Sequence, residues 1–480
     1  MEYDLLIKDA IVVDGTGREQ FRADVAVTDG KIEKVGQLNK AKAKSVIDAF
    51  GQCLAPGFID VHSHDDTSAI RKPKMEEKVT QGVTTVVVGN CGISASPITL
   101  CQDPPDPMNL LGDKEAFCYP TFSCYADAVA KAMPNVNIAA LIGHTTLRAH
   151  VMDDLSREAT EEEITKMREL LDCSLAQGAI GLSSGLAYAT ATHAPPEELV
   201  SLMPTVAKYN GLYVTHLRNE FEAIVEALNE AFETAGSAKV PLVVSHVKCA
   251  GKANWGRSAE VIDVLDSAAK QQTVASDCYP YSASASTLDL NQVTDEIDIF
   301  IPWSKRHPEM AGRLLADIAQ EWQISLIEAA QKLQPAGAVY HCMDESDVEA
   351  FLKFRLTMIG SDGLPGTPSP HPRLWGTFPK VIGHYCRERK LFDLPTAIHK
   401  MTGLSAAQFG LHNRGVIAEG HWADLVLFDF SSIADMATYD QPQRPSKGIS
   451  HVWVNGKLSY QKGVVEASNG GMLIKRVSVS

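Results

Sequence analysis

Eight short apolar runs, separated by segments with helical periodicity, most strongly limit how this chain of 480 residues can fold. The runs are Phe58–Val61, Thr84–Val88, Asn137–Ile142, Ile180–Ser183, Leu212–Thr215, Val240–Ser245, Thr273–Ser276 and Thr357–Gly360. Near-continuous apolar strands that alternate with helices are typical of a parallel sheet with a covered outer face. Eight such units predict a (β/α)₈ TIM-like barrel, whose functional side chains lie at the carboxyl ends of the strands.

The helical half of this pattern is clearest in the segment that begins at Thr160, before the fourth apolar run. Thr160 and Glu163 form a capping-box sequence, which marks the start of a helix. Ile164, Met167 and Leu171 then recur at helical spacing. We therefore predict an amphipathic helix here that packs its apolar side against the barrel.

The two ends of the chain carry a different pattern, of short strands and turns. Strands are expected at Asp4–Ile7, Ile11–Val13, Asp24–Val27, Lys31–Val35, Ala423–Asp429 and His451–Val454. The dipeptide Asn455-Gly456 is a hairpin signal. We predict that residues 1–56 and 408–480 together form one small β-sandwich domain, and that residues 57–407 form the catalytic barrel.

One interval is too long for a simple connection between barrel strands. About 75 residues separate the seventh run from the eighth, with helical stretches around Met310–Trp322 and Ser325–Leu333. Long segments inside compact domains are usually functional. We therefore expect residues 287–346 to be an insertion between strands 7 and 8 that lies on the active face of the barrel.

The net charge argues against some classes of binding partner, and the spacing of the cysteines indicates the cellular compartment. A formal net charge of −15 argues against nucleic acid and against anionic membrane surfaces as partners. No apolar run approaches the roughly 20 residues that a membrane-spanning helix needs. The N-terminus does not look like a secretory signal, and the 10 cysteines are scattered without a Cys-x-x-Cys pair. We expect reduced thiols, a cytoplasmic location and a small-molecule substrate; the oligomeric state is not indicated.

Residues that can bind metal stand where the predicted strands end. They are His62 and His64 after the first run, Cys91 after the second, His216 after the fifth, His246 after the sixth, and Asp362 after the eighth. A barrel brings these strand ends to one rim, so we expect one metal site there. Imidazole and thiolate together favour zinc over magnesium or calcium. A nearby carboxylate can take a proton from a metal-activated water, which suits hydrolysis of an amide.

At these residues the chain resembles the amidohydrolase superfamily, and most closely its N-acyl-D-amino-acid deacylases. The similar stretches are 56–66 (PGFIDVHSHDD), 81–93 (QGVTTVVVGNCGI), 255–258 (WGRS), 359–365 (IGSDGLP) and 371–378 (HPRLWGTF). The Asn-Cys-Gly segment around Cys91 is the most specific of them. Many superfamily members bridge two metals with a lysine from strand four, but here that run ends in Ser183-Ser184-Gly185. The deacylase branch uses a cysteine after strand two instead.

The resemblance implies a role for each matching residue. It implies one tightly held zinc on Cys91, His216 and His246, and a second, weaker site on His62 and His64 that shares Cys91. It implies Asp362 as the general acid/base. It further implies that the substrate carboxylate is held by four residues: Lys248, Arg373, Tyr279 and Ser286. The preference for the D configuration follows from the resemblance alone.

The side chain of the substrate is indicated by what the loop after Ser286-Thr287 lacks. Relatives that prefer D-glutamate carry an arginine shortly after this position, whereas this chain continues Leu-Asp-Leu-Asn-Gln-Val-Thr. Asp289 in this stretch would repel an acidic side chain if it faces the pocket. We therefore expect substrates with neutral, apolar side chains in preference to glutamate.

Three other interpretations of the sequence stay open at this point. Residues 181–185 (GLSSG) match the Gly-x-Ser-x-Gly pattern of serine hydrolases, which would make Ser183 a nucleophile. The same metal rim could serve a hydantoinase-like or dihydroorotase-like enzyme that acts on cyclic amides. Finally, a barrel of this kind can keep its fold and become a binding protein without catalytic activity.

Overall fold

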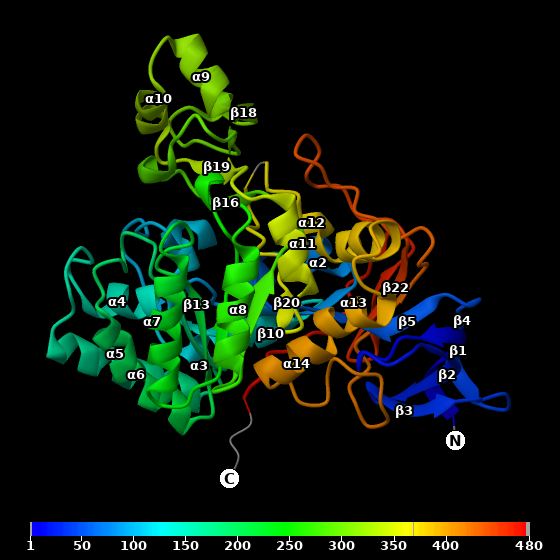
Figure 1. Cartoon of the computed structure of the whole chain (residues 1–480). Coiled ribbons are helices and arrows are strands. Elements are labelled where there is room, and N and C mark those ends of the chain that lie inside the picture. The colour runs from blue at the N-terminus through cyan, green and yellow to red at the C-terminus, as the bar shows by residue number, and fades with distance from the viewer. Residues whose placement is uncertain (1, 368, 477–480) are drawn as a thin grey trace.

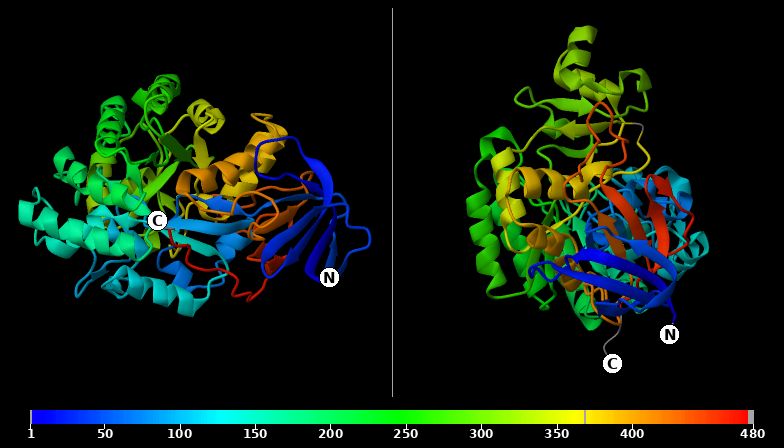
Figure 2. Two further views of the ribbon diagram at one scale, coloured as in Figure 1. Left: turned by 90° about the horizontal axis from the view of Figure 1, so that it is seen from below. Right: turned by 90° about the vertical axis from the view of Figure 1, so that its right-hand side faces the viewer.

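The computed structural model describes residues 2–367 and 369–476. Residues 477–480 of the predicted C-terminal segment lie outside them. Eight parallel strands form a closed barrel at the centre, and Figure 1 and Figure 2 show helices around it. Its strands are β6 (Phe58–Asp60), β7 (Val83–Val88), β10 (Asn137–Ala140) with β11 (Ile142–Gly143), β12 (Gly181–Gly185), β13 (Leu212–His216), β14 (Leu242–Val244), β15 (Val274–Cys278) and β20 (Thr357–Ile359). The predicted (β/α)₈ barrel is therefore confirmed.

Strand pairing follows chain order around the barrel. β6, β7 and β10 pair in one run, and β11 to β15 pair in another that ends at β20. The third strand is interrupted at Leu141, which separates β10 from β11. A parallel bridge between Ser63 and Gly363 joins the first strand to the last and closes the ring. Because all eight strands are parallel, their carboxyl ends lie on one rim.

Helices cover the outer face of the barrel. They are α3 (Phe122–Ala132), α4 (His144–Val151), α5 (Glu161–Ala176), α6 (Pro196–Lys208), α7 (Ile224–Gly236), α8 (Ser258–Ala269), α11 (Glu345–Lys353), α12 (Arg373–Lys380) and α13 (Leu394–Met401). Thr160 and Glu163 form the predicted capping box at the start of α5, where each side chain bonds the other residue's backbone N–H.

Alternation along the strands creates two apolar layers. Ile59, Val87, Val214 and Met358 belong to a cluster inside the barrel, while their sequence neighbours pack outward against the helices. Helix α14 (Gly403–Phe409) adds side chains to the inner cluster at the end opposite the active rim (Figure 1). The barrel interior is thus a packed core.

Strands from both ends of the chain share one nine-stranded sheet beside the barrel. They are β1 (Glu2–Val12), β2 (Phe21–Thr28), β3 (Lys31–Gly36), β4 (Lys42–Asp48), β5 (Cys53–Pro56), β21 (Leu425–Phe428), β22 (Ile449–Val454), β23 (Lys457–Gln461) and β24 (Val464–Val465). The blue and red strands lie side by side in Figure 2, because β5 pairs with β21. The backbone of Ile32 bonds to residues 420–421, so the sheet folds back on itself around a second core.

The N-terminal strands differ in detail from the expectation. The two strands predicted at Asp4–Ile7 and Ile11–Val13 are one strand, β1, with an irregularity between Ile7 and Ala10. Asp9 within it has φ 54°, which marks a bulge. The sequence analysis missed β4, whose side chains are largely exposed and therefore show no apolar alternation. The predicted hairpin at Asn455-Gly456 does connect β22 to β23.

The insertion before the eighth barrel strand has a sheet of its own. Four antiparallel strands form it: β16 (Ser284–Thr287), β17 (Ile299–Ile301), β18 (Arg313–Leu314) and β19 (Gly337–Tyr340). Helix α10 (Leu326–Leu333) lies where a helix was expected, whereas α9 (Leu315–Trp322) covers only the second part of the expected stretch Met310–Trp322 because Arg313–Leu314 forms β18. In Figure 1 this unit projects above the carboxyl rim, with β16 and β19 next to the barrel.

Among the described residues, no helix is long and apolar enough to cross a membrane.

A buried ion pair connects the nine-stranded sheet to the barrel. Arg414 donates to Asp424 and to Asn455 Oδ1 (2.9 Å), and Asp424 also accepts from Asn137 Nδ2 (3.2 Å) at the start of β10. Arg414 and Asp424 are both 5% exposed. The pair therefore fixes the sheet against the third barrel strand.

Arg414→Met should lower the free energy of unfolding by about 3–5 kcal/mol, because it leaves the Asp424 carboxylate buried without its cation. Urea denaturation of purified protein measures this. The control is Arg22→Met, which breaks the exposed pair with Asp9 and should cost less than about 1 kcal/mol. Equal effects of the two substitutions would contradict the structural role of Arg414.

Candidate metal centre and active site

All six predicted metal-binding and acid/base residues converge on the carboxyl rim. Two groups of donor atoms form there, and within each group the atoms lie within 4.8 Å of one another. The groups are His62, His64, Cys91 and Asp362, and Cys91, His216 and His246. Cys91 belongs to both groups, so its sulfur is the point at which two metal positions could meet.

Short distances separate these donors. Cys91 Sγ lies 3.2 Å from His62 Nε2 and 3.4 Å from His246 Nε2. Asp362 Oδ1 lies 3.1 Å from His64 Nε2 and 3.5 Å from His62 Nε2. Such a concentration of imidazole, thiolate and carboxylate is the chemistry of a zinc site.

Ring nitrogens without a hydrogen-bond partner are a second observation that these residues can hold a metal. The Nδ1 atoms of His64 and His216 are buried, and neither has a hydrogen-bond partner among the described residues. A buried ring nitrogen without a partner is costly unless something else occupies its lone pair. The His216 ring stands edge-on to that of His246 at 4.4 Å, and a cation held by both residues would meet this need.

Three of these residues have a left-handed backbone conformation, which directs their side chains to the rim. Cys91, His246 and Asp362 have φ values of 52°, 33° and 47°. The left-handed region is unfavourable for residues other than glycine, and such strain concentrates at functional sites. All three residues lie two or three positions after the end of a barrel strand, where the chain turns over the rim.

The loop that carries Cys91 is held from both ends. The Asp66 carboxylate accepts hydrogen bonds from the backbone N–H groups of Gly89 (3.3 Å) and Ala95 (3.2 Å). Gly89 has φ +78°, and a Cβ there would lie 2.3 Å from the carbonyl oxygen of Leu141. Only glycine fits this close approach of two strand ends, which sets the position of Cys91.

Ser183 has a structural role in the same loop. Its hydroxyl donates to the carbonyl of Gly89 and accepts from the backbone N–H of Gly92 (3.0 Å), and its side chain is fully buried. A serine nucleophile of the Gly-x-Ser-x-Gly type starts a helix immediately after a strand. Here Ser183 lies inside β12, and the next helix, α6, begins at Pro196. The geometry therefore does not support a serine hydrolase.

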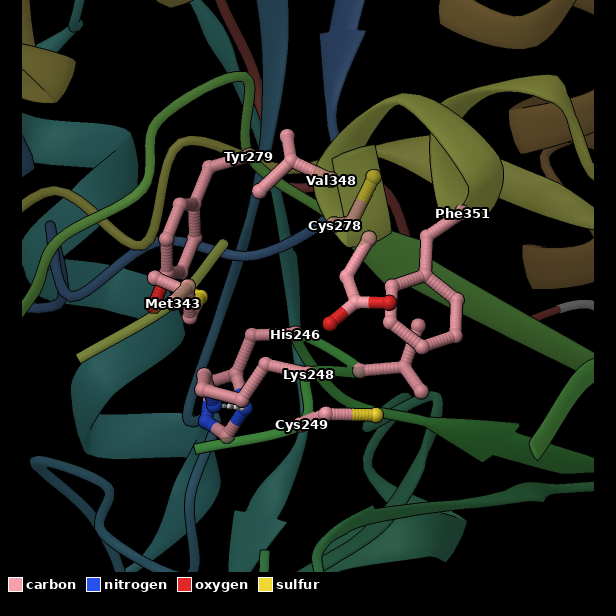
Figure 3. Close-up of a pocket in the computed structure, with 10 residues that line it drawn as sticks. His246, Lys248, Cys249, Cys278, Tyr279, Met343, Val348 and Phe351 are labelled. Carbon is pink, nitrogen blue, oxygen red and sulfur yellow. Dashed lines mark hydrogen bonds between the residues drawn. The ribbon is translucent and has the colours of Figure 1, made fainter. Parts of the chain in front are cut away.

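Two carboxylates and one ammonium group contact two of the histidines and orient them. Asp277 Oδ1 accepts from the backbone N–H of His246 (2.9 Å) and lies 3.3 Å from His62 Nδ1. Lys248 Nζ contacts Glu220 Oε1 (2.5 Å) and His246 Nδ1 (2.8 Å), the contact drawn as a dashed line in Figure 3. These partners fix which ring nitrogen His62 and His246 present to the rim.

The cluster keeps its acidic groups ionised. Burial opposes ionisation of Cys91, but the neighbouring His62 and His246 outweigh it and bring the thiol's pKa well below its ordinary value. Burial likewise opposes ionisation of Asp362, yet Arg373 and His62 hold the pKa of this carboxyl well below its usual range. The site therefore offers a thiolate and a carboxylate at neutral pH.

Arg373 lies beside the metal residues as the first residue of α12. Its Nη2 contacts Asp362 Oδ2 (2.9 Å) and donates to the carbonyl of Ala285 (3.0 Å). The guanidinium lies 4.6 Å from the centre of the Tyr279 ring. Its Nε and Nη1, like the Tyr279 hydroxyl, are buried and have no hydrogen-bond partner within the described part of the chain. These donors are available to an anionic group.

A cavity of about 840 Å³ opens over this cluster. His64, His216, His246, Lys248, Tyr279 and Asp362 line its floor. The insertion supplies one wall, through residues 284–292 with Gln334, Tyr340 and Cys342, and Ser286 lies in this wall. All four residues predicted to hold a carboxylate thus lie in or beside one space, with Arg373 just behind Tyr279 and Asp362.

Comparison with known proteins agrees with this geometry. A model of the amidohydrolase family matches residues 45–460. A D-aminoacylase from Alcaligenes xylosoxydans xylosoxydans is 44% identical over 476 residues, covering 99% of this chain and 98% of that protein. This chain belongs to the amidohydrolase family. Within that family, the predicted resemblance to the D-aminoacylases is confirmed.

Solved structures place this amidohydrolase beside two deacylases. A D-aminoacylase with a binuclear metal centre superposes with a TM-score of 0.97 at 45% identity, covering 99% of this chain and 100% of that one. The N-acyl-D-glutamate deacylase of Bordetella bronchiseptica, complexed with zinc and a phosphonate inhibitor, gives 0.96 at 40%, with coverage of 99% and 100%. An L-hydantoinase is only 17% identical (TM-score 0.63) and shares the fold.

Two residues of the amidohydrolase site escaped the sequence analysis. Asp277 directly follows the seventh apolar run, so the strand-end criterion that found the histidines could have found it. Glu220 lies four residues after His216 in a loop, and its contacts with Lys248 and His246 depend on the neighbouring strand. Only the three-dimensional arrangement reveals this second residue.

Cys91→Ala should weaken zinc binding by more than the roughly 10–100-fold that loss of an outer-shell partner costs, since it removes a donor common to both groups. Metal content after dialysis against a graded chelator series measures this. The matched control is Cys278→Ala, a buried free cysteine in β15 outside both donor groups. Unchanged zinc retention in the Cys91 variant would remove it from the metal site.

Proposed function

We propose that this amidohydrolase is a zinc-dependent N-acyl-D-amino-acid deacylase, which hydrolyses N-acyl-D-amino acids to a carboxylate and a free D-amino acid. One observation carries the proposal. A cluster of metal donors with the ionised Asp362 lies directly beside the buried Arg373, whose Nε and Nη1 are unpaired among the described residues. A hydrolytic centre and a carboxylate receptor therefore adjoin each other, as an N-acyl amino acid requires.

Cys91, His216 and His246 would hold the tight zinc, and His62 and His64 would form a weaker second site that shares Cys91. The division is supported by the two donor groups that meet at the Cys91 sulfur. The related D-aminoacylase is described as showing one-metal activation and second-metal attenuation. When bound, zinc supplies a Lewis acid that polarises the amide carbonyl and makes water a nucleophile near neutral pH.

Asp362 would act as the general acid/base. Its low pKa makes it a carboxylate at neutral pH, so it starts the cycle as the base that takes a proton from the attacking water. It then gives this proton to the nitrogen of the departing D-amino acid. Arg373 Nη2 at 2.9 Å holds one carboxylate oxygen, and the other lies 3.1 Å from His64 Nε2, so the carboxylate is held in position beside the metal donors.

Arg373, Lys248, Tyr279 and Ser286 would bind the α-carboxylate of the substrate. The planar guanidinium of Arg373 suits a carboxylate, and its free edge and the Tyr279 hydroxyl are buried donors that need an acceptor. The Lys248 ammonium is paired with Glu220, so its charge is partly compensated before substrate binds. Anchoring of the carboxylate on one side of the acyl group would select the D configuration.

The side chain of the substrate would be neutral and apolar. Two cations line the cavity, and both have carboxylate partners: Arg218 pairs with Glu230, and Lys248 pairs with Glu220. The cavity also presents Asp289, from the insertion, and Asp106, which comes from the loop before Met108 and accepts a hydrogen bond from Thr287 Oγ1 (3.1 Å). An acidic side chain would therefore meet negative charge with no free cation among the described lining residues, which favours methionine or leucine over glutamate.

The cyclic-amide alternative is less well supported. The hydantoinase comparison, at 17% identity, shows the fold alone. The fourth strand ends in Ser183, Ser184 and Gly185, and offers no lysine for bridging two metals. Cys91 stands at the junction of the two donor groups instead.

We also propose that the enzyme works in the cytoplasm on a small molecule, without nucleic acid or membrane as a partner. All 10 cysteines are free, as expected in a reducing compartment. The net charge of −15 disfavours polyanionic partners.

The first test is amine release from matched N-acetyl-D- and N-acetyl-L-amino acids (Met, Leu, Glu and Asp), with zinc quantified in the same sample. We expect the D series to be preferred by at least about 100-fold, because a misplaced acyl group loses its alignment with the reacting groups. D-Met and D-Leu should exceed D-Glu and D-Asp. Activity on hydantoins alone, with zinc bound, would favour the cyclic-amide alternative.

Asp362→Asn should lower kcat by about 10²–10⁴-fold while zinc stays bound, because the amide cannot exchange the proton. Turnover and metal content are measured on the same preparation. Asp127→Asn serves as the control: it is an exposed residue of α3, outside both donor groups and the cavity lining, and should leave kcat for N-acetyl-D-methionine within about twofold of the parent enzyme. A variant at Asp362 with normal turnover would show that another group moves the proton.

A further inference from the structure

Lys78 is a fully buried ammonium directly beneath the rim of the active site. It lies on the short helix α2 (Glu76–Val79) and has no exposed surface. Its Nζ contacts Asp60 Oδ2 (2.8 Å), Asp65 Oδ2 (2.9 Å) and Ser361 Oγ (3.1 Å), all of them also fully buried. A lysine in such a place is rare unless its charge is matched, and here two carboxylates match it.

The contacts of Lys78 fall on both sides of the barrel closure. Asp60 ends β6, two residues before His62, and Asp65 directly follows His64. Ser361 follows β20 and directly precedes Asp362. One ammonium therefore touches a sequence neighbour of each histidine of the weaker site and of the acid/base residue.

Further hydrogen bonds make this connection rigid. Ser361 donates to Asp60 through its hydroxyl (2.6 Å) and through its backbone N–H (2.8 Å), and its hydroxyl accepts from the backbone N–H of Gly363 (3.1 Å). On the rim side, the Asp362 N–H donates to the carbonyl of His62 (2.7 Å). Since Asp362 itself has φ 47°, its unfavourable conformation has to be held by the groups around it.

We propose that Lys78 is a positioning residue, which sets the distance between Asp362 and the His62/His64 pair by binding Asp60, Asp65 and Ser361. It touches no substrate and binds no metal. This role rests on the proposed function, because it concerns the placement of the proposed acid/base group. Without the ammonium, two buried carboxylates face each other uncompensated, and the first and last strand ends are joined only by the hydrogen bonds of Ser361 to Asp60 and by backbone bonds such as that of Asp362 to His62.

The chain offers a matched control in Lys400. It too is a buried lysine, 3% exposed, and its Nζ donates to the carbonyls of Phe354 (2.5 Å) and Thr357 (3.1 Å). Thr357 begins β20, so Lys400 supports the opposite end of the same strand from Ser361. A merely structural role would make Lys78→Met and Lys400→Met alike.

The experiment compares Lys78→Met and Lys400→Met with the parent enzyme by thermal unfolding, by kcat and KM on the best N-acyl-D-amino acid, and by zinc titration against a chromophoric chelator. We expect both variants to unfold at lower temperature. Lys78→Met alone should lose about 10–100-fold in kcat, with KM within about twofold, and should bind the second zinc about 10-fold more weakly. The first zinc should bind normally.

The proposal fails if Lys78→Met keeps kcat within twofold of the parent enzyme, or if Lys400→Met loses as much. If Lys78→Met does not fold, Asp65→Asn/Lys78→Met replaces it under the same criteria, because Asp60 still accepts from Ser361 when the extra charge is gone. If the parent enzyme hydrolyses no N-acyl amino acid, the proposed function fails, and the affinity for the second zinc alone then decides the role of Lys78.

Discussion

One buried thiolate, facing imidazoles from three other strands, is the interaction on which the active face depends. Cys91 contacts His62 and His246 directly, and the negative charges of Cys91, Asp277 and Asp362 in turn raise the pKa of His62 well above its ordinary value, against the effect of burial. Positive and negative groups in such a cluster stabilise each other and cannot be changed singly without cost. A metal cation can take the place of the protons that the histidines would otherwise carry.

Buried hydrogen bonds around this cluster keep its residues in the required geometry. Cys91, His246 and Asp362 adopt a left-handed backbone conformation that is unfavourable on its own. Asp66 and Ser183 fix the loop of Cys91, and Asp277 fixes the backbone of His246. Each unfavourable local conformation is therefore matched by buried hydrogen bonds, and the stability of the fold is linked to the geometry needed for chemistry.

Much of this arrangement could be predicted from the sequence, because it depends on local pattern. Apolar runs located the eight barrel strands, and polar residues at their ends located His62, Cys91, His216, His246 and Asp362. Those inferences need only the rule that parallel strands share a rim.

What the sequence could not show depends on contacts between distant segments. Glu220 and Lys78 contact side chains that are distant in the sequence, and the residues next to them in the sequence do not indicate these contacts. Arg373 has two nitrogens without a partner among residues 2–367 and 369–476, and this depends on its surroundings in the fold. Strand β4 was missed for a different reason, since its exposed residues lack the apolar alternation by which strands are recognised.

The separate sheet of the insertion has a consequence for how such enzymes diversify. The metal donors come from the barrel strands, whereas the facing wall of the cavity comes from β16, β19 and the loop after Thr287. Changes in that wall alter the shape and charge offered to a side chain without moving any donor atom. On the proposed function, the residues that face the substrate side chain and the residues that could hold metal therefore belong to different parts of the chain, so the first can vary while the second stay fixed.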